Sequence, residues 1–247
     1  MPILRYLLLT STLVFVALAT ADAQISRIGI EVGPDLTQFR ERFQGLTVTS
    51  DPRATLFVAA PIDFAIADKP LFVRLRPAFT SRASKYEEDG YEVFVGPNDI
   101  REVDIRAVSG FRTAELGLSV GGELQRAGWT FGATTGLVPA YFLSQFAKVK
   151  GLEDYPEEEE LFGLDSDGED WEGIRRFELS YQIGLEAGRA FGAHRLRVGL
   201  RHRASLNSLA KDVEDDPALG GLFDDLKVFS RSWVPSVTYV FAVGGSE

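Results

Sequence analysis

The stretch FELSYQIGLEAG, residues 177–188, decides the fold of this chain. Its odd positions carry apolar or aromatic side chains, large ones as far as Leu185 and then Ala187, and its even positions carry Glu, Ser, Gln and Gly. Successive side chains of a strand point to opposite faces, so a period of two predicts a strand with one apolar and one polar face.

The same alternation recurs along the chain. Leu196, Val198 and Leu200 alternate with Arg197 and Arg201, for example. We expect eight strands, at approximately 25–33, 54–65, 70–83, 104–123, 128–148, 173–189, 193–208 and 228–242. The run 54–65 alternates least clearly. Prolines within these runs, at 61, 77, 139 and 235, lack a ladder donor and predict bulges or strand ends.

The polar face decides between a soluble and a membrane barrel. It is rich in Gly, Ser and Thr and carries charges of both signs, which suits the narrow interior of an eight-stranded barrel. An interior charge network is expected from Glu31, Arg74, Arg76, Glu115, Glu178, Glu186, Arg197 and Arg201. The apolar face would then meet lipid, as in transmembrane β-barrels.

Aromatic positions and connection lengths point the same way. Trp129 and Tyr141 flank one strand, about 30 Å apart across a membrane at the usual rise and tilt. The expected connections at 66–69, 124–127 and 190–192 are short, and those at 34–53, 84–103, 149–172 and 209–227 are long. Short periplasmic turns and long external loops are typical of an antiparallel, up-and-down, all-β barrel in the outer membrane.

The first residues predict export. Arg5 precedes an apolar core, and Ala21-Asp22-Ala23 has the small-x-small pattern of a signal-peptidase site. We expect a signal peptide at 1–23, cleaved after Ala23, and one outer-membrane barrel domain at 24–247. The alternative is an uncleaved membrane anchor.

Composition excludes several function classes. The formal net charge is −10, which argues against nucleic acid as a partner. The chain has no Cys, so thiol nucleophiles, disulfides and Cys metal sites are excluded. No cofactor motif is present, and we expect neither a cofactor nor catalytic residues. The exception considered is a lipid-modifying site of His202 with Ser205 or Ser208.

Several motifs occur along the strands: IGIEVGP at 28–34, LFVRLRP at 71–77, FGATTGLVPAY at 131–141, GLEAG at 184–188, the run 197–206 and YVF at 239–241. Together these motifs resemble the PorT-like outer-membrane β-barrel family of secreted bacterial proteins. The resemblance spans 24–242 and implies an eight-stranded barrel in the cell outer membrane. One branch of that family acts in protein secretion, which implies secretion-system proteins as partners.

The stretch 151–172 holds eleven acidic residues. A solvated external loop and weak association of divalent cations, with Asp165, Asp167 and Asp170 as ligands, are both open. The Gly and Glu spacing excludes an EF-hand, and we expect no dedicated metal site.

Three functions compete at this stage. The first is a non-enzymatic outer-membrane barrel without an open pore, in contact with outer-membrane lipid, with a structural, surface-interaction or envelope role. The second is an accessory component of an outer-membrane secretion system. The third is a soluble periplasmic barrel whose apolar face turns inward to bind an apolar ligand.

Overall fold

The computed structural model describes residues 25–43, 46–66, 70–96, 99–150, 174–210 and 226–243. The expected signal peptide and the acidic residues Asp165, Asp167 and Asp170 lie outside these ranges. The described residues form β1 (Ile25–Phe43), β2 (Leu46–Thr49), β3 (Asp51–Ala59), β4 (Ile62–Ala65), β5 (Leu71–Gly96), β6 (Asp99–Arg126), β7 (Trp129–Lys150), β8 (Phe177–Phe191), β9 (His194–Ser205) and β10 (Lys227–Ala242). In these ranges, no helix is long and apolar enough to cross a membrane.

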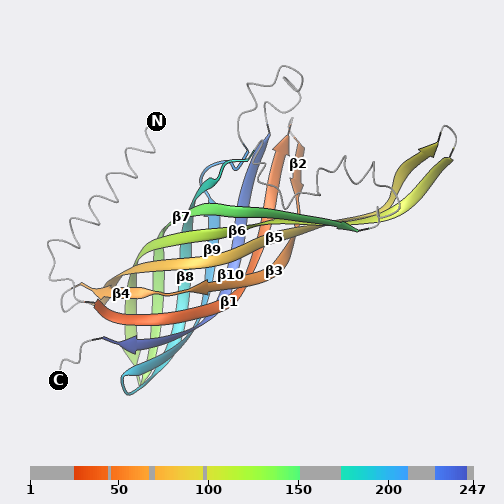
Figure 1. The fold of residues 1–247 in the computed structure, drawn as a ribbon. Coiled ribbons are helices and arrows are strands. Elements are labelled where there is room, and N and C mark those ends of the chain that lie inside the picture. Colours follow the sequence, from red (N-terminus) through yellow and green to blue (C-terminus); the bar gives the residue numbers. More distant parts are fainter. Residues whose placement is uncertain are drawn as a thin grey trace.

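The strands close into an antiparallel ring of eight (Figure 1). From β5 to β10 each strand pairs with the next strand of the chain, and β1 pairs with β10 over Arg27–Arg42. The strands β3 and β4 act as a single member of the ring, because both lie between β1 and β5. The short strand β2 lies outside the ring and forms a hairpin with the last residues of β1, at the end of the barrel that carries the long connections. The expected up-and-down eight-stranded barrel is confirmed.

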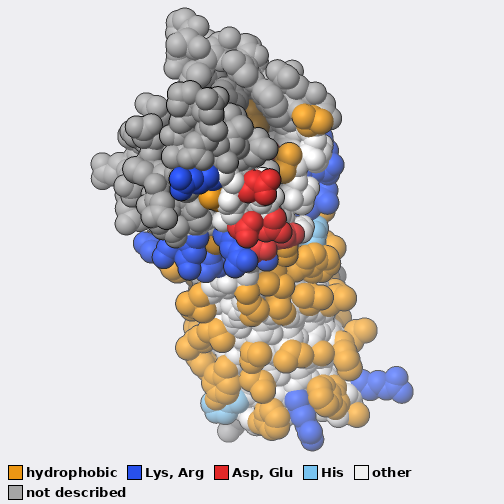
Figure 2. Space-filling view, turned by 90° about the vertical axis from the view of Figure 1, so that its right-hand side faces the viewer, with side chains coloured by type: hydrophobic (Ala, Val, Ile, Leu, Met, Phe, Trp, Pro, Cys, Tyr) orange, Lys and Arg blue, Asp and Glu red, His pale blue; other side chains and the backbone are white. Residues whose placement is uncertain are grey.

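The two faces of the sheet are sorted as the alternation requires. Exposed outward positions are large and apolar, such as Ile30 at 57% and Leu185 at 69%, whereas Glu178 and Arg82 inside are at most 1% exposed. Exposed large apolar side chains occur on every member of the ring, and Figure 2 shows hydrophobic side chains covering the barrel wall on the face in view. The alternative of a barrel lined by its apolar side chains is therefore wrong.

Two of the expected long connections are strands instead. The strand β1 continues to Phe43 and turns back into β2, and β5 and β6 run as a paired hairpin from 84 to 109. Figure 1 shows this second hairpin projecting well beyond the ring. Outside the lipid region an outward side chain has no reason to be apolar, so the alternation that marks a membrane strand disappears there while the ladder continues.

The opposite end of the barrel has tight turns. Ala127 and Gly128, with φ of 50° and 78°, join β6 to β7, and Gly192 with φ of 63° begins the turn from β8 to β9. Positive φ at both central residues is the geometry of a type I′ hairpin turn, which matches the twist of the flanking strands. The expected run 54–65 is interrupted at Ala60 and Pro61, where proline offers no donor to the ladder.

Candidate functional site

The interior of the barrel is the candidate site, because the ionic side chains gather there. Six of the eight residues expected in the network are less than 5% exposed: Glu31, Arg74, Arg76, Glu178, Arg197 and Arg201. Glu115 is also buried, and the Glu186 side chain is 12% exposed. The ring brings all eight together in one lumen, where they form three groups along the barrel axis.

The first group lies at the turn end. Arg74 donates from Nε to Asp63 Oδ1 at 2.6 Å and also pairs with Glu186 on β8, across the lumen. Arg197 lies 3.3 Å from Asp63 and 3.4 Å from Glu186. In the same group at the turn end of the barrel, Glu123 accepts hydrogen bonds from Arg27 and Arg195.

The middle group centres on Glu31. This carboxylate accepts hydrogen bonds from Arg201 and, at 2.6 Å, from the Ser236 hydroxyl. Arg76 lies 4.0 Å from Glu31 and donates to the Gln182 side-chain oxygen. The Arg201 guanidinium also stacks over the Phe57 ring, 4.8 Å from its centroid. Two guanidinium groups are thus held beside one carboxylate in the middle of the lumen.

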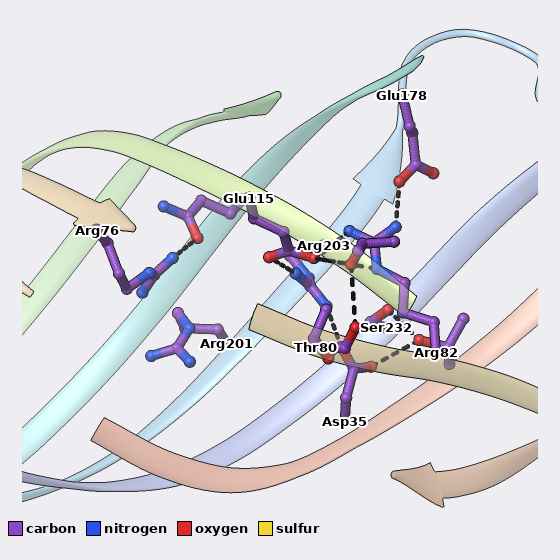
Figure 3. Close-up of polar contacts among 12 residues, drawn as sticks. Asp35, Arg76, Thr80, Arg82, Glu115, Glu178, Arg201, Arg203 and Ser232 are labelled. Atoms are coloured by element: carbon purple, nitrogen blue, oxygen red, sulfur yellow. Dashed lines mark hydrogen bonds and ion pairs between the residues drawn. The ribbon is translucent and has the colours of Figure 1, made fainter. Parts of the chain in front are cut away.

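The third group, drawn in Figure 3, lies toward the loop end. Arg82 donates from Nη2 to Glu115 Oε1 at 2.6 Å and also pairs with Glu178. Arg203 pairs with both Glu115 and Asp35. Hydroxyl groups complete the network. Thr80 donates to Asp35 at 3.1 Å, Thr37 donates to Asp35 at 2.6 Å, and Ser230 donates to Glu178.

Sequence reasoning missed several members of the network. Alternation places Arg203 on the same polar face as Arg197 and Arg201, but Arg203 was not among the expected members of the network. Arg82 has the parity of Arg74 and Arg76 on β5, so alternation could have found it. Asp35 was placed in a loop, although it continues the inward parity of Glu31. Asp63 follows the break at Pro61, which obscures the parity of its strand.

Apolar side chains lie inside the barrel beyond the third group. Phe39, Phe142 and Leu209 form a buried cluster, against which Phe111 and Val228 pack. The Phe39 and Phe111 rings meet edge to face with centroids 5.6 Å apart. This cluster packs the interior at the loop end as a small hydrophobic core.

The residues considered for catalysis are not brought together. His202 takes the outward face, where its ring lies 4.6 Å from the Trp233 ring. Ser205 accepts from the Ser230 backbone N–H at 2.9 Å, and Ser208 accepts from the N–H of Val228 at 3.1 Å. Each serine hydroxyl therefore accepts a hydrogen bond from the β10 backbone at or just beyond the end of β9. In the described part of the chain, no group of three or more His, Asp or Glu residues is arranged to hold a metal ion.

No protein-family model and no curated protein matches the chain. Solved structures that resemble it include Neisserial surface protein A (NspA), at 12% identity and a TM-score of 0.35 over 85% of this chain and 95% of that one. The outer membrane protease OmpT from Escherichia coli is 9% identical, with a TM-score of 0.45 over 90% of this chain and 98% of that one. Ail, the attachment invasion locus protein of Yersinia pestis, is 12% identical, with a TM-score of 0.29 over 88% of this chain and 100% of that one. The chain is thus similar to small outer-membrane β-barrels.

Proposed function

We propose that the chain is an integral outer-membrane barrel with a structural, surface-interaction or envelope role and without an open pore. One observation carries this proposal: an apolar band faces outward while paired arginines and carboxylates fill the interior. In water this arrangement would expose the apolar band, whereas in a bilayer it buries that band in hydrocarbon. The pairing of β1 with β10 also gives hydrogen-bond partners to backbone N–H and C=O groups, which lipid cannot provide.

The packing of the lumen supports a closed barrel. Gln182, Glu178 and Arg82 have at most 1% exposure, so solvent does not reach the middle and loop-end parts of the interior. An eight-stranded barrel encloses only enough space for side chains. The expected result is no steady conductance above that of a protein-free planar bilayer. Reproducible single-channel steps from the purified protein would overturn the closed-barrel proposal.

Membrane location is tested separately by cell fractionation. The full-length chain should sediment with the outer membrane, remain there after carbonate or high-salt washing, and migrate differently on gels before and after boiling. A protein recovered in the soluble periplasmic fraction would contradict the proposal. Amino-terminal sequencing of the membrane form tests cleavage after Ala23, with Gln24 expected as the first residue.

The finer assignment to the PorT-like family rests on the motifs at 28–34 and 131–141. It carries the second role, as an accessory of an outer-membrane secretion system. Affinity purification of the membrane-embedded protein tests that role. Recovery of secretion components in stoichiometric amount would support it, and their absence would leave the envelope role.

A further inference from the structure

Basic side chains gather on the outward surface of the barrel at the loop end. Residues that pair directly across strands point to the same side of the sheet. Two rows carry these side chains: Lys85 with Val108 and Lys148, and Arg106 with Lys150. Lys85 has the parity of Phe79, which lies on the outward face and is 46% exposed. Arg53 is an exposed residue of β3, beside a register shift between β3 and β5. We call Arg53, Lys85, Arg106, Lys148 and Lys150 the basic pocket.

These five residues line a cavity of about 420 Å³. Uncharged lining comes from Tyr86, Ala107 and Val108, and Glu87 contributes the one carboxylate of the lining. Four strands supply the lining: β3, β5, β6 and β7. The cavity is therefore built on the sheet itself and not on a connecting loop.

The pocket has an excess of positive charge. Lys85 lies 3.4 Å from Glu87, and both side chains are well exposed. Among the side chains that the structure describes, no carboxylate lies at ion-pair distance from Arg53, Arg106, Lys148 or Lys150. Like charges held this close repel one another, so an anion that enters the cavity relieves that repulsion. This differs from the lumen, where every network arginine has an acidic or amide partner.

The position of the pocket limits what the anion can be. Lys85 lies six residues, about 20 Å along β5, beyond outward-facing Phe79, at the base of the hairpin that projects beyond the ring. Figure 2 shows Lys and Arg side chains at the loop-end border of the apolar band, with some Asp and Glu side chains beside them. A ligand here would keep its acyl chains against the band while its headgroup reaches the cations.

We propose that the basic pocket binds a phosphorylated glycolipid of the outer leaflet through its phosphate groups. The inference rests on the outer-membrane location proposed above. Lys and Arg form strong charge-assisted hydrogen bonds with phosphate oxygens. A phosphomonoester carries about −1.5 to −2 charges near neutral pH, so four uncompensated cations match a headgroup with two phosphates better than a phospholipid with one.

Native mass spectrometry of the purified full barrel in detergent tests this inference. The probes are diphosphorylated lipid A, its dephosphorylated form, and phosphatidylglycerol. The pocket variant is Lys148→Gln with Lys150→Gln. The matched control is Arg126→Gln with Arg189→Gln, which removes two exposed cations at the turn end. Gel migration before and after boiling verifies that each variant folds.

We expect the pocket variant to bind diphosphorylated lipid A roughly tenfold more weakly than the wild type, and the control to bind as the wild type does. Dephosphorylated lipid A should bind weakly to all three. An equal loss of lipid A affinity in the two variants would overturn the assignment of the pocket as a phosphate site. Equal binding of lipid A and its dephosphorylated form would overturn it as well. Phosphatidylglycerol binding as tightly as lipid A would reject the glycolipid assignment. Cell fractionation measures membrane location independently of lipid binding. A failure of the lipid A proposal can therefore be distinguished from a failure of the outer-membrane proposal.

Discussion

Arg203 on β9 and Glu115 on β6 form an ion pair across the lumen, between strands that are not neighbours in the sheet. Both side chains are nearly inaccessible to solvent, and each has a further ionic partner: Asp35 for Arg203 and Arg82 for Glu115. The network thus links opposite walls of the barrel by side chains as well as by the backbone ladder.

Replacing Glu115 by Gln should destabilise the barrel strongly. The change leaves Arg82 and Arg203 without this carboxylate in a site closed to water, and removing one partner of a buried ion pair costs about 3–5 kcal/mol. The measurement is urea unfolding of the barrel in lipid vesicles, followed by Trp fluorescence. Arg112→Gln, at an exposed outward position, is the control and should change stability by less than about 0.5 kcal/mol. Equal stability of the two variants would show that the network contributes little.

A charge on the outward face should be costly in the middle of the band and tolerated at its edge. Leu200, 46% exposed, lies six residues into β9 from the turn end, and Leu206, 48% exposed, follows the other end of the same strand. We expect Leu200→Arg to reduce the free energy of folding into vesicles by about 2–4 kcal/mol and Leu206→Arg by at most about 1 kcal/mol. Similar costs at the two sites would contradict the placement of the band.

Gly136 marks a close approach of β7 to β6. A Cβ at this residue would overlap the carbonyl oxygen of Leu118 and lie 2.5 Å from Ser119 Cα. Gly136→Ala should therefore force the two strands apart and cost about 1–3 kcal/mol. Gly122→Ala is the matched control, because the nearest atom to its added Cβ would be Leu71 Cδ2 at 3.5 Å. A control variant as unstable as Gly136→Ala would refute the steric explanation.

The absence of Cys from the sequence permits single-site labelling without background. Glu87→Cys, in the projecting hairpin, should react with a membrane-impermeant maleimide in intact cells. Gln125→Cys, beside the tight turn after β6, should react only after the outer membrane is permeabilised. This pattern follows if the long hairpins face outward and the short turns face the periplasm. The reverse pattern would invert the proposed orientation.

Alternation predicted the ring and the two faces because each membrane strand must satisfy lipid on one side and a packed lumen on the other. The run 177–188 is an example: Glu178, Ser180 and Gln182 are buried and Tyr181, Ile183 and Leu185 are exposed. The signal failed where that constraint ends. Beyond the band, Arg40 and Glu41 of β1 form ladder pairs with β10 and β2 without an apolar outward face.

The partners within the network could not be predicted from the strand pattern. Parity places Arg74 and Glu186 in the lumen, but the pairing of β5 with β8 side chains depends on barrel diameter and strand stagger. The basic pocket was missed for a related reason. Its cations come from four strands, and Arg53, Lys85 and Arg106 were all assigned to or beside long loops, so only the extended cross-strand register brings them together.

The seam between β1 and β10 joins the earliest and the latest described strands of the chain. A partly synthesised or partly inserted polypeptide therefore has no way to complete the cylinder, and Arg201 cannot reach Glu31 on β1 until the final strand has arrived between them in the sheet. Before β10 pairs with β1, we expect the arginines and carboxylates to be hydrated, and these charged groups keep the unfolded chain hydrophilic. Maturation is thus expected to be a single concerted event, in which sealing the seam and dehydrating the ionic interior occur together.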